Sequence, residues 1–327
     1  MKKIVAIVGP TASGKSALAV ELAKCLRGEV VSCDSMQIYK YFDIGTAKPT
    51  AEEMCGITHH MIDVVDPTVV DAYSCAEFVC DAKTIIDDIL SRGKIPILCG
   101  GTGLYVDSII SATEFSDTES DPEHRRRLFE LAEEHGNEYV YDMLKAVDPE
   151  SAAATHPNNL KRVIRALEIY HASGITKSEW DRRSHEKPSE YDAAFIGLAF
   201  ADREKLYERI NHRVDIMLEN GLLDEVRRLI DADILRRGTT AAQAIGYKEL
   251  INYFDGEVEL DDAVEAIKRE SRRYAKRQMT WFKRNPNIHW IYPDIIDSDN
   301  ERFKIIVNNA IEYLTKHKFC DIIKNNI

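Results

Sequence analysis

Short apolar runs alternate with amphipathic helical segments over the first hundred residues of the chain. The runs Ile4–Val8, Glu29–Cys33 and Lys94–Cys99 have the composition of buried strands. Between them, Ser16–Leu26 and Cys75–Leu90 have the apolar spacing of helices. This alternation predicts an α/β fold, in which helices flank a parallel sheet on both faces.

The pattern changes at about residue 113. The following 80 or so residues are polar and helix-prone, whereas Ala194–Phe200 is apolar again and predicts a return to the sheet. Two long helices are expected near 203–220 and 261–284. The predicted parts are a catalytic core, 1–112 and 194–292; an all-helical insertion, 113–193; and a tail without recognisable chemistry, 293–327.

Composition narrows the class of protein. Apolar residues make up 44% and charged residues 30%, as in globular proteins, and no run of about 18 apolar residues predicts a membrane-spanning helix. The net charge of −12 argues against a generic nucleic-acid coat but not against a local basic surface. The seven cysteines are odd in number and include no C-x-x-C, which favours reduced thiols in a cytoplasmic protein over disulfides or a zinc ribbon.

The first predicted strand is followed by a phosphate-binding motif. The segment Gly9–Ser16, GPTASGKS, fits G-x-x-x-x-G-K-[ST] between a strand and a helix. Its backbone N–H groups would surround an anion at the helix N-terminus, Lys15 would reach the outer phosphate, and the Ser16 hydroxyl would ligate Mg²⁺. The candidate diphosphate ligands are Gly9, Thr11, Ala12, Ser13, Gly14, Lys15 and Ser16. The motif is typical of ATP-binding proteins, but it does not specify the reaction.

Two further candidates follow predicted strands. Asp34 comes after the second strand and Thr102 after the third, so both are expected at the carboxyl edge of the sheet, where ligands bind. Asp34 could accept a proton or hold a metal-bound water, or it could simply cap the next helix. Thr102 could donate a hydrogen bond to a leaving phosphate, or it could belong to a plain turn. The residues alone leave both alternatives open.

A basic segment stands out within this acidic chain. Eight basic residues and one acid, Glu270, lie between Lys268 and Arg284. Solvated helix faces usually mix the two signs of charge, so this segment favours a polyanionic partner whose phosphates the cations contact. Val264, Ile267, Tyr274 and Trp281 recur at helical spacing and are predicted to face the core.

The motifs together resemble one family. GPTASGKS, DSMQIYKYFDIGTAKPT, GGTGLY, HPNNLKRVIRALEIY, AIGYKE and YAKRQMTWFKR occur here in the order and spacing of the bacterial tRNA dimethylallyltransferases, also called tRNA isopentenyltransferases. The resemblance extends from about residue 3 to 292. It implies a P-loop, kinase-like core and a helical insertion that binds the anticodon stem-loop.

The resemblance also implies a reaction and a set of site residues. The enzyme would transfer a dimethylallyl group from dimethylallyl diphosphate, with Mg²⁺, to N6 of adenosine-37 in tRNAs reading codons that begin with U. Asp34 would be the general base, and Thr102 and Arg213 would hold the diphosphate, with Arg209 one turn away as the alternative to Arg213. The residues implied to contact tRNA are Asp34, Ser35, Met36, Gln37, Lys161, Arg162, Arg165, Gln243, Gly246, Tyr247, Lys248, Lys276, Arg277, Gln278, Trp281 and Lys283. The phosphate loop would then bind an isoprenoid diphosphate in place of ATP, and we expect a cytoplasmic monomer.

Three other functions compete with this prediction. A P-loop kinase of a small molecule would need a lid with arginines over the γ-phosphate, and no such segment is recognisable. A relative that prenylates AMP or ADP to make cytokinins would need neither the basic helix nor the insertion. A non-catalytic nucleic-acid binder would leave Lys15, Ser16 and Asp34 without a role.

Overall fold

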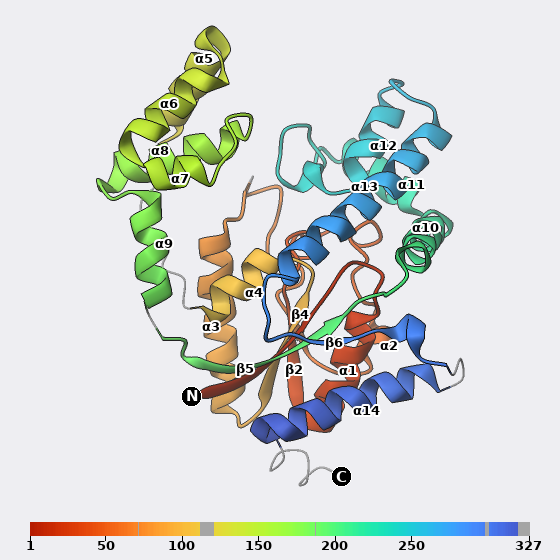
Figure 1. The fold of residues 1–327 in the computed structure, drawn as a ribbon. Helices are drawn as coiled ribbons and strands as arrows, with labels where there is room; N and C mark the ends of the chain where they lie inside the picture. Colours follow the sequence, from red (N-terminus) through yellow and green to blue (C-terminus); the bar gives the residue numbers. More distant parts are fainter. Residues whose placement is uncertain (71, 112–120, 187, 298–300, 320–327) are drawn as a thin grey trace. The chain divides into compact units, whose positions relative to one another are not determined.

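The computed structural model describes residues 1–70, 72–111, 121–186, 188–297 and 301–319 of the chain (Figure 1). These residues form two compact units, of which the first combines Met1–Ile109 with Tyr191–Ile327 and the second is Ile110–Glu190. The expected start of the insertion, residue 113, lies outside the described residues. At the other boundary, the strand that returns to the core begins at Tyr191, three residues earlier than the sequence pattern indicates.

A six-stranded sheet organises the first unit. Its strands are β1 (Lys2–Val8), β2 (Gly28–Ser32), β3 (His59–His60), β4 (Ile95–Gly100), β5 (Tyr191–Leu198) and β6 (His289–Ile291). Their order is β3-β2-β4-β1-β5-β6, and every neighbouring pair is parallel. The predicted α/β fold with a parallel sheet is therefore confirmed. The edge strands β3 and β6 are too short to have given a recognisable apolar run.

The direction of the chain crossovers determines which face each helix covers. The connection from β1 to β2 passes over β4 toward one edge of the sheet, and the connection from β3 to β4 returns in the opposite direction. Since parallel crossovers are right-handed, α1 (Lys15–Leu26) and α3 (Cys75–Ser91) lie on opposite faces. Both helices contact β2 and β4. The capping box at the start of α3, formed by Ser74 and Glu77, fixes where that helix begins.

The remaining helices of the first unit follow from these strands. They are α2 (Ala51–Met54), α4 (Gly103–Ile110), α10 (Arg203–Glu219), α11 (Leu222–Asp231), α12 (Tyr247–Phe254), α13 (Leu260–Phe282) and α14 (Arg302–Leu314), with short helical turns η1 (Ala241–Gln243), η2 (Pro293–Ile295) and η3 (Thr315–Phe319). Within the described residues, none of the helices combines the length and the apolar character needed to cross a bilayer. The six cysteines of that part of the chain are all free thiols.

The C-terminal segment is part of the core and is not a separate tail. Ile306, Ala310 and Leu314 of α14 are buried in the same apolar cluster as Leu18 and Leu22 of α1. Spacings of four residues place these three side chains on one face of α14. This corrects the prediction that 293–327 forms a distinct part, because at least its helix completes one face of the sheet.

The second unit is entirely helical in its described part. Its helices are α5 (Pro122–His135), α6 (Asn137–Val147), α7 (Pro149–Ala153), α8 (Leu160–Ser173) and α9 (Lys177–Glu186). The unit has its own apolar cluster, which includes Leu128, Val140, Leu144 and Val163. Asp121 caps α5 ahead of a proline at the first helical position, as the sequence signature of a helix start requires.

Candidate active site

The phosphate loop joins β1 to α1 at the carboxyl edge of the sheet. Gly9 has a φ of +142°, and a Cβ there would lie 2.2 Å from the backbone oxygen of Leu198, so only glycine fits. Gly14, with a φ of +95°, precedes α1, and no side chain caps that helix. The N–H groups of the first turn are therefore available to an anion, and the helix dipole favours one.

The charged form of Lys15 is destabilised in this loop. Its Nζ donates to the Pro10 oxygen at 2.6 Å. Burial lowers the pKa of Lys15 to about 8, and the positive charge of Arg213 adds to the lowering while the charge of Asp34 opposes it. Ser16, the predicted Mg²⁺ ligand, is exposed at the start of α1. A bound polyanion would stabilise the charged form of Lys15.

Asp34 lies in a turn after β2 and caps no helix. Its Oδ1 accepts from the N–H of Met36 at 2.9 Å and from that of Gln37 at 3.4 Å. Among the described residues, its other oxygen, Oδ2, has no hydrogen-bond partner. The Gln37 side chain in turn donates to the carbonyl oxygens of Thr46 and Ala47, which fixes the turn against the next loop. One carboxylate oxygen thus holds the turn and the other is free to accept a proton.

Thr102 is bound to this turn. Its Oγ1 accepts from the Ser35 N–H at 3.1 Å, and its own N–H donates to the Cys33 oxygen at 3.1 Å. The approach is close enough that a Cβ on Gly100 would lie 2.1 Å from the Cys33 oxygen. The structure therefore brings Thr102 and Asp34 together, as the carboxyl-edge argument predicts.

The structure distinguishes the two arginines of α10. The pKa of Arg213 is lowered by burial and is raised in part by Asp34, and its charge also acts on Lys15. Arg209 is exposed, with its Nε donating to the Ala12 oxygen at 3.0 Å and its guanidinium 5.6 Å from the Phe200 ring centre. Arg213 is thus the cation that interacts with both Lys15 and Asp34, whereas Arg209 holds the outer side of the phosphate loop.

The basic helix α13 has two different halves. In its first part, Lys268 is 2.8 Å from Asp215, and both Arg269 and Arg273 pair with Glu270. Further along, four exposed cations have no carboxylate partner among the described residues: Lys276, Arg277, Lys283 and Arg284. The exposed cations without a carboxylate partner among the described residues therefore lie in the second half of the helix and just after its end.

Two residues of the expected RNA-contact stretch on α13 turn inward. Gln278 is only 5% exposed and bonds to the phosphate loop. Trp281 is half-buried, donates from Nε1 to Asp107 Oδ2 at 2.7 Å, and lies so close to Gly103 that a Cβ there would be 2.1 Å from the indole. Of the four residues predicted to face the core, Ile267 is fully buried, and Val264, Tyr274 and Trp281 are half-buried.

Tyr247 is likewise an internal residue and not a surface for RNA. Its side chain is completely buried, and its hydroxyl donates to Glu225 at 2.6 Å while accepting from the Gly45 N–H at 3.2 Å. Burial and the neighbouring charge of Glu225 raise the pKa of the phenol. The phenol is used to hold the 43–45 loop, so the Tyr247 side chain has no exposed surface in this structure. The neighbouring Gly246 is buried as well, with a φ of +100°.

Glu225 is the residue that sequence reasoning missed. It is 4% exposed, and its carboxylate accepts from the backbone N–H groups of Asp43, Ile44 and Gly45 in addition to the Tyr247 hydroxyl. A signal was present, because Glu225 falls on the apolar face of α11, three residues after the buried Leu222. A carboxylate at such a position requires partners.

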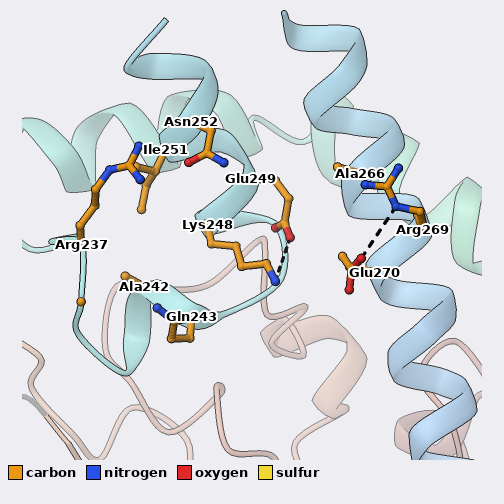
Figure 2. A pocket seen from close by; sticks show the side chains of 11 residues that line it. Arg237, Ala242, Gln243, Lys248, Glu249, Ile251, Asn252, Ala266, Arg269 and Glu270 are labelled. Carbon is orange, nitrogen blue, oxygen red and sulfur yellow. Dashed lines mark ion pairs between the residues drawn. The ribbon is translucent and has the colours of Figure 1, made fainter. Parts of the chain in front are cut away.

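Gln243 and Lys248 line a cavity of about 440 Å³ between η1, α12 and α13 (Figure 2). Its cations are already paired: Lys248 lies 3.3 Å from Glu249, and Arg269 lies 3.8 Å from Glu270. None of the predicted diphosphate ligands lines it.

The remaining predicted RNA contacts lie on α8 of the insertion. Lys161, Arg162 and Arg165 are exposed, and Arg165 is 3.7 Å from the buried Glu168. Arg125 holds the same carboxylate at 2.6 Å. Lys161 and Arg162 therefore have the more available charges.

Comparisons with known proteins identify the family. The profile of the family described as IPP transferase matches residues 37–285. A tRNA dimethylallyltransferase of Caldanaerobacter subterraneus subsp. tengcongensis is 51% identical over 319 residues, covering 97% of this chain and 99% of that protein. One from Bacillus subtilis is 50% identical over 287 residues, covering 88% of this chain and 90% of that protein.

Solved structures give the same assignment. The tRNA isopentenylpyrophosphate transferase of Bacillus halodurans superposes with a TM-score of 0.70 at 45% identity, covering 98% of this chain and 99% of that one. A eukaryotic dimethylallyltransferase acting on tRNA superposes with a TM-score of 0.77 at 31% identity, covering 95% and 80%. The chain therefore belongs to the IPP transferase family, and the relatives it matches over most of its length are tRNA dimethylallyltransferases.

Proposed function

We propose that this chain transfers a dimethylallyl group from dimethylallyl diphosphate to N6 of adenosine-37 in tRNAs reading codons that begin with U. The products are N6-dimethylallyladenosine and diphosphate. The observation that carries the proposal is the uncapped start of α1 with Lys15 at the carboxyl edge of the sheet, where the turn that holds Asp34 and Thr102 also lies. An anion site and a candidate base thereby adjoin at one edge of the sheet.

The chemistry follows from these charges. The allylic C1–O bond to the diphosphate breaks more readily when the leaving group's negative charge is neutralised, which Lys15, Arg213 and the N–H groups of α1 would do. The adenine N6 forms the new bond to C1 and loses a proton, which Asp34 Oδ2 accepts. Thr102, held beside Asp34 through Ser35, would donate a hydrogen bond from its hydroxyl to the diphosphate.

The residues present fit a magnesium ion. The exposed Ser16 hydroxyl stands at the start of α1, and the described residues hold no cluster of three carboxylate, histidine or cysteine ligands. Mg²⁺ commonly takes one or two protein ligands and completes its shell with phosphates and water, so one hydroxyl beside a diphosphate suffices. Bound there, Mg²⁺ would neutralise part of the diphosphate charge.

Exposed cations supply the expected RNA contacts. Lys276 and Arg277 on α13, Lys283 just after it, and Lys161 and Arg162 on α8 have no carboxylate partners among the described residues. Such cations contact phosphates and give affinity without reading sequence. The target base must leave its stack to reach Asp34, at a cost of a few kcal/mol. We expect the enzyme to act as a monomer in the cytoplasm, where its tRNA substrate is found.

Nucleoside analysis tests this proposal against its competitors. The protein is incubated with Mg²⁺, dimethylallyl diphosphate and unmodified tRNA, and in parallel with AMP, ADP or ATP in place of the tRNA. Dimethylallyladenosine that forms only in the reaction with tRNA supports the proposal. Prenylated AMP or ADP would instead establish the cytokinin-type activity. Asp34→Asn should reduce kcat by roughly 10²–10⁴ with little change in the affinity for either substrate. If only tRNA affinity fell, Asp34 would be a positioning residue and no base.

A further inference from the structure

Gln278 connects two loops that are far apart in sequence. Its Oε1 accepts from the Thr11 N–H at 2.8 Å, and its Nε2 donates to the Gly101 oxygen at 3.1 Å. Thr11 belongs to the phosphate loop, and Gly101 immediately precedes Thr102. Both ends of one buried amide are thus used, one on each loop that carries proposed diphosphate ligands.

The neighbouring glycine is matched to this amide. A Cβ added to Gly101 would lie 2.0 Å from Gln278 Nε2, while the next nearest atom outside Gln278 is 3.8 Å away. The side chain that would need to move is the one that bonds to both loops. Gly101 therefore permits the close approach on which the two hydrogen bonds depend.

The position of Gln278 on its helix separates it from the RNA-facing cations. Lys276 and Arg277 are exposed, whereas Gln278 is buried beside Ala275 and Phe282 on the opposite side of α13. One helix thus presents cations on one face and holds the diphosphate loops with the other.

We propose that Gln278 is a positioning residue for the diphosphate, setting the separation between the phosphate loop and Thr102, and that it does not contact RNA. The inference rests on the proposed function, since it assigns the diphosphate to these two loops. A neutral amide suits the position because it can accept from one loop and donate to the other without adding negative charge beside the substrate. A glutamate would lack the donor and repel the diphosphate.

Inorganic diphosphate provides a probe that needs no RNA. Its affinity is measured by calorimetry with Mg²⁺ for the wild type, Gln278→Met and Gln278→Ala, and tRNA affinity is measured separately by filter binding. Gln278→Met keeps the volume but loses both hydrogen bonds, and it should weaken diphosphate binding about 5- to 30-fold, with tRNA affinity changed less than about twofold. Lys276→Met, on the exposed face, is the matched control and should show the reverse.

Steady-state kinetics should separate the two substrates in the same way. In Gln278→Met the KM for dimethylallyl diphosphate should rise while the KM for tRNA stays constant, and the thermal unfolding midpoint reports whether the fold is intact. A loss of stability alone, with unchanged diphosphate affinity per folded molecule, would overturn the proposal. So would a loss confined to tRNA binding.

A double-mutant cycle tests the geometry directly. Gly101→Ala should displace Gln278 and weaken diphosphate binding about as much as Gln278→Ala does. The double variant should bind no more weakly than the worse single variant, because both changes remove the same pair of hydrogen bonds. Additive losses would contradict the proposal. A wild type that fails to bind diphosphate would overturn the proposed function together with this inference, whereas equal binding by the wild type and all variants would overturn the inference alone.

Discussion

Two loops at the carboxyl edge of the sheet present backbone N–H groups in similar ways but satisfy them differently. In the loop Asp43–Gly45, three N–H groups donate to the carboxylate of Glu225. In the phosphate loop, α1 begins without a capping side chain. One loop carries its anion within the protein, and the other offers an anion site to the substrate.

The difference explains the role of each loop. A built-in carboxylate makes the Asp43–Gly45 loop a permanent scaffold, whose carbonyl-rich continuation at Thr46 and Ala47 holds Gln37 beside Asp34. The phosphate loop instead buries Lys15 near Arg213, and this burial, with the neighbouring positive charge as a smaller cause, lowers the pKa of Lys15. Charge that is uncompensated in the free protein is available for binding energy when a diphosphate arrives.

Removing the internal anion should have the largest effect. Glu225→Ala leaves three backbone N–H groups and the Tyr247 hydroxyl without their acceptor, so we expect the free energy of unfolding to fall by about 3–5 kcal/mol in urea titrations. Asp224→Ala, an exposed neighbour on the same helix, should change it by less than about 0.5 kcal/mol. A loss below about 1 kcal/mol for Glu225→Ala would mean that the loop does not depend on its carboxylate.

The charge of the phosphate loop should appear in the pH dependence of diphosphate binding. With a pKa of about 8 in the free protein, Lys15 is charged below pH 8 and neutral above it. Because the anion binds the charged form, affinity should be constant well below pH 8, begin to fall near pH 8 and fall by up to about tenfold per unit above it. Lys15→Arg keeps its charge at these pH values and should flatten the profile. An unaltered profile in that variant would assign the titration to another group.

A smaller change tests how much the Tyr247 hydroxyl contributes to the loop Asp43–Gly45. Tyr247→Phe removes one of the four donors to Glu225 and the acceptor for the Gly45 N–H, but the other N–H donors remain. We expect a loss of about 1 kcal/mol in the free energy of unfolding, well below that of Glu225→Ala. Tyr253→Phe, whose hydroxyl has no hydrogen-bond partner within the described residues, is the control. Equal losses of unfolding free energy in the two variants would show that the Tyr247 hydroxyl does not contribute to the hydrogen bonds around Glu225.

The smallest effect concerns RNA affinity. If Lys276 contacts a phosphate, Lys276→Ala should reduce the slope of log K for tRNA against log salt by about 0.7–0.9. Lys268→Ala on the same helix, where the lysine already pairs with Asp215, should leave the slope unchanged. The comparison fails if both variants shift the slope equally, because available charge would then not distinguish the two halves of α13.

Local signals in the sequence determined much of this protein. The strand-loop-helix order around Gly9–Ser16 fixes the phosphate loop, because its glycines and the helix N-terminus act within a few residues. The capping box at Ser74 and the apolar run of β1 are local in the same sense. That Asp34 and Thr102 lie close together could be predicted from the sequence, since the carboxyl ends of parallel strands share one edge.

Which polar residues turn inward depends on packing between distant parts of the chain. Gln278 reads as one more residue of a basic helix, yet it bonds to Thr11, 267 positions away, and Glu225 bonds to Asp43 across 182 positions. The same holds for α14, which completes a sheet face formed mainly by the N-terminal half of the chain. Residue type and helical spacing indicate that a side chain can be buried, but its hydrogen-bond partner depends on which distant loop the fold brings against it.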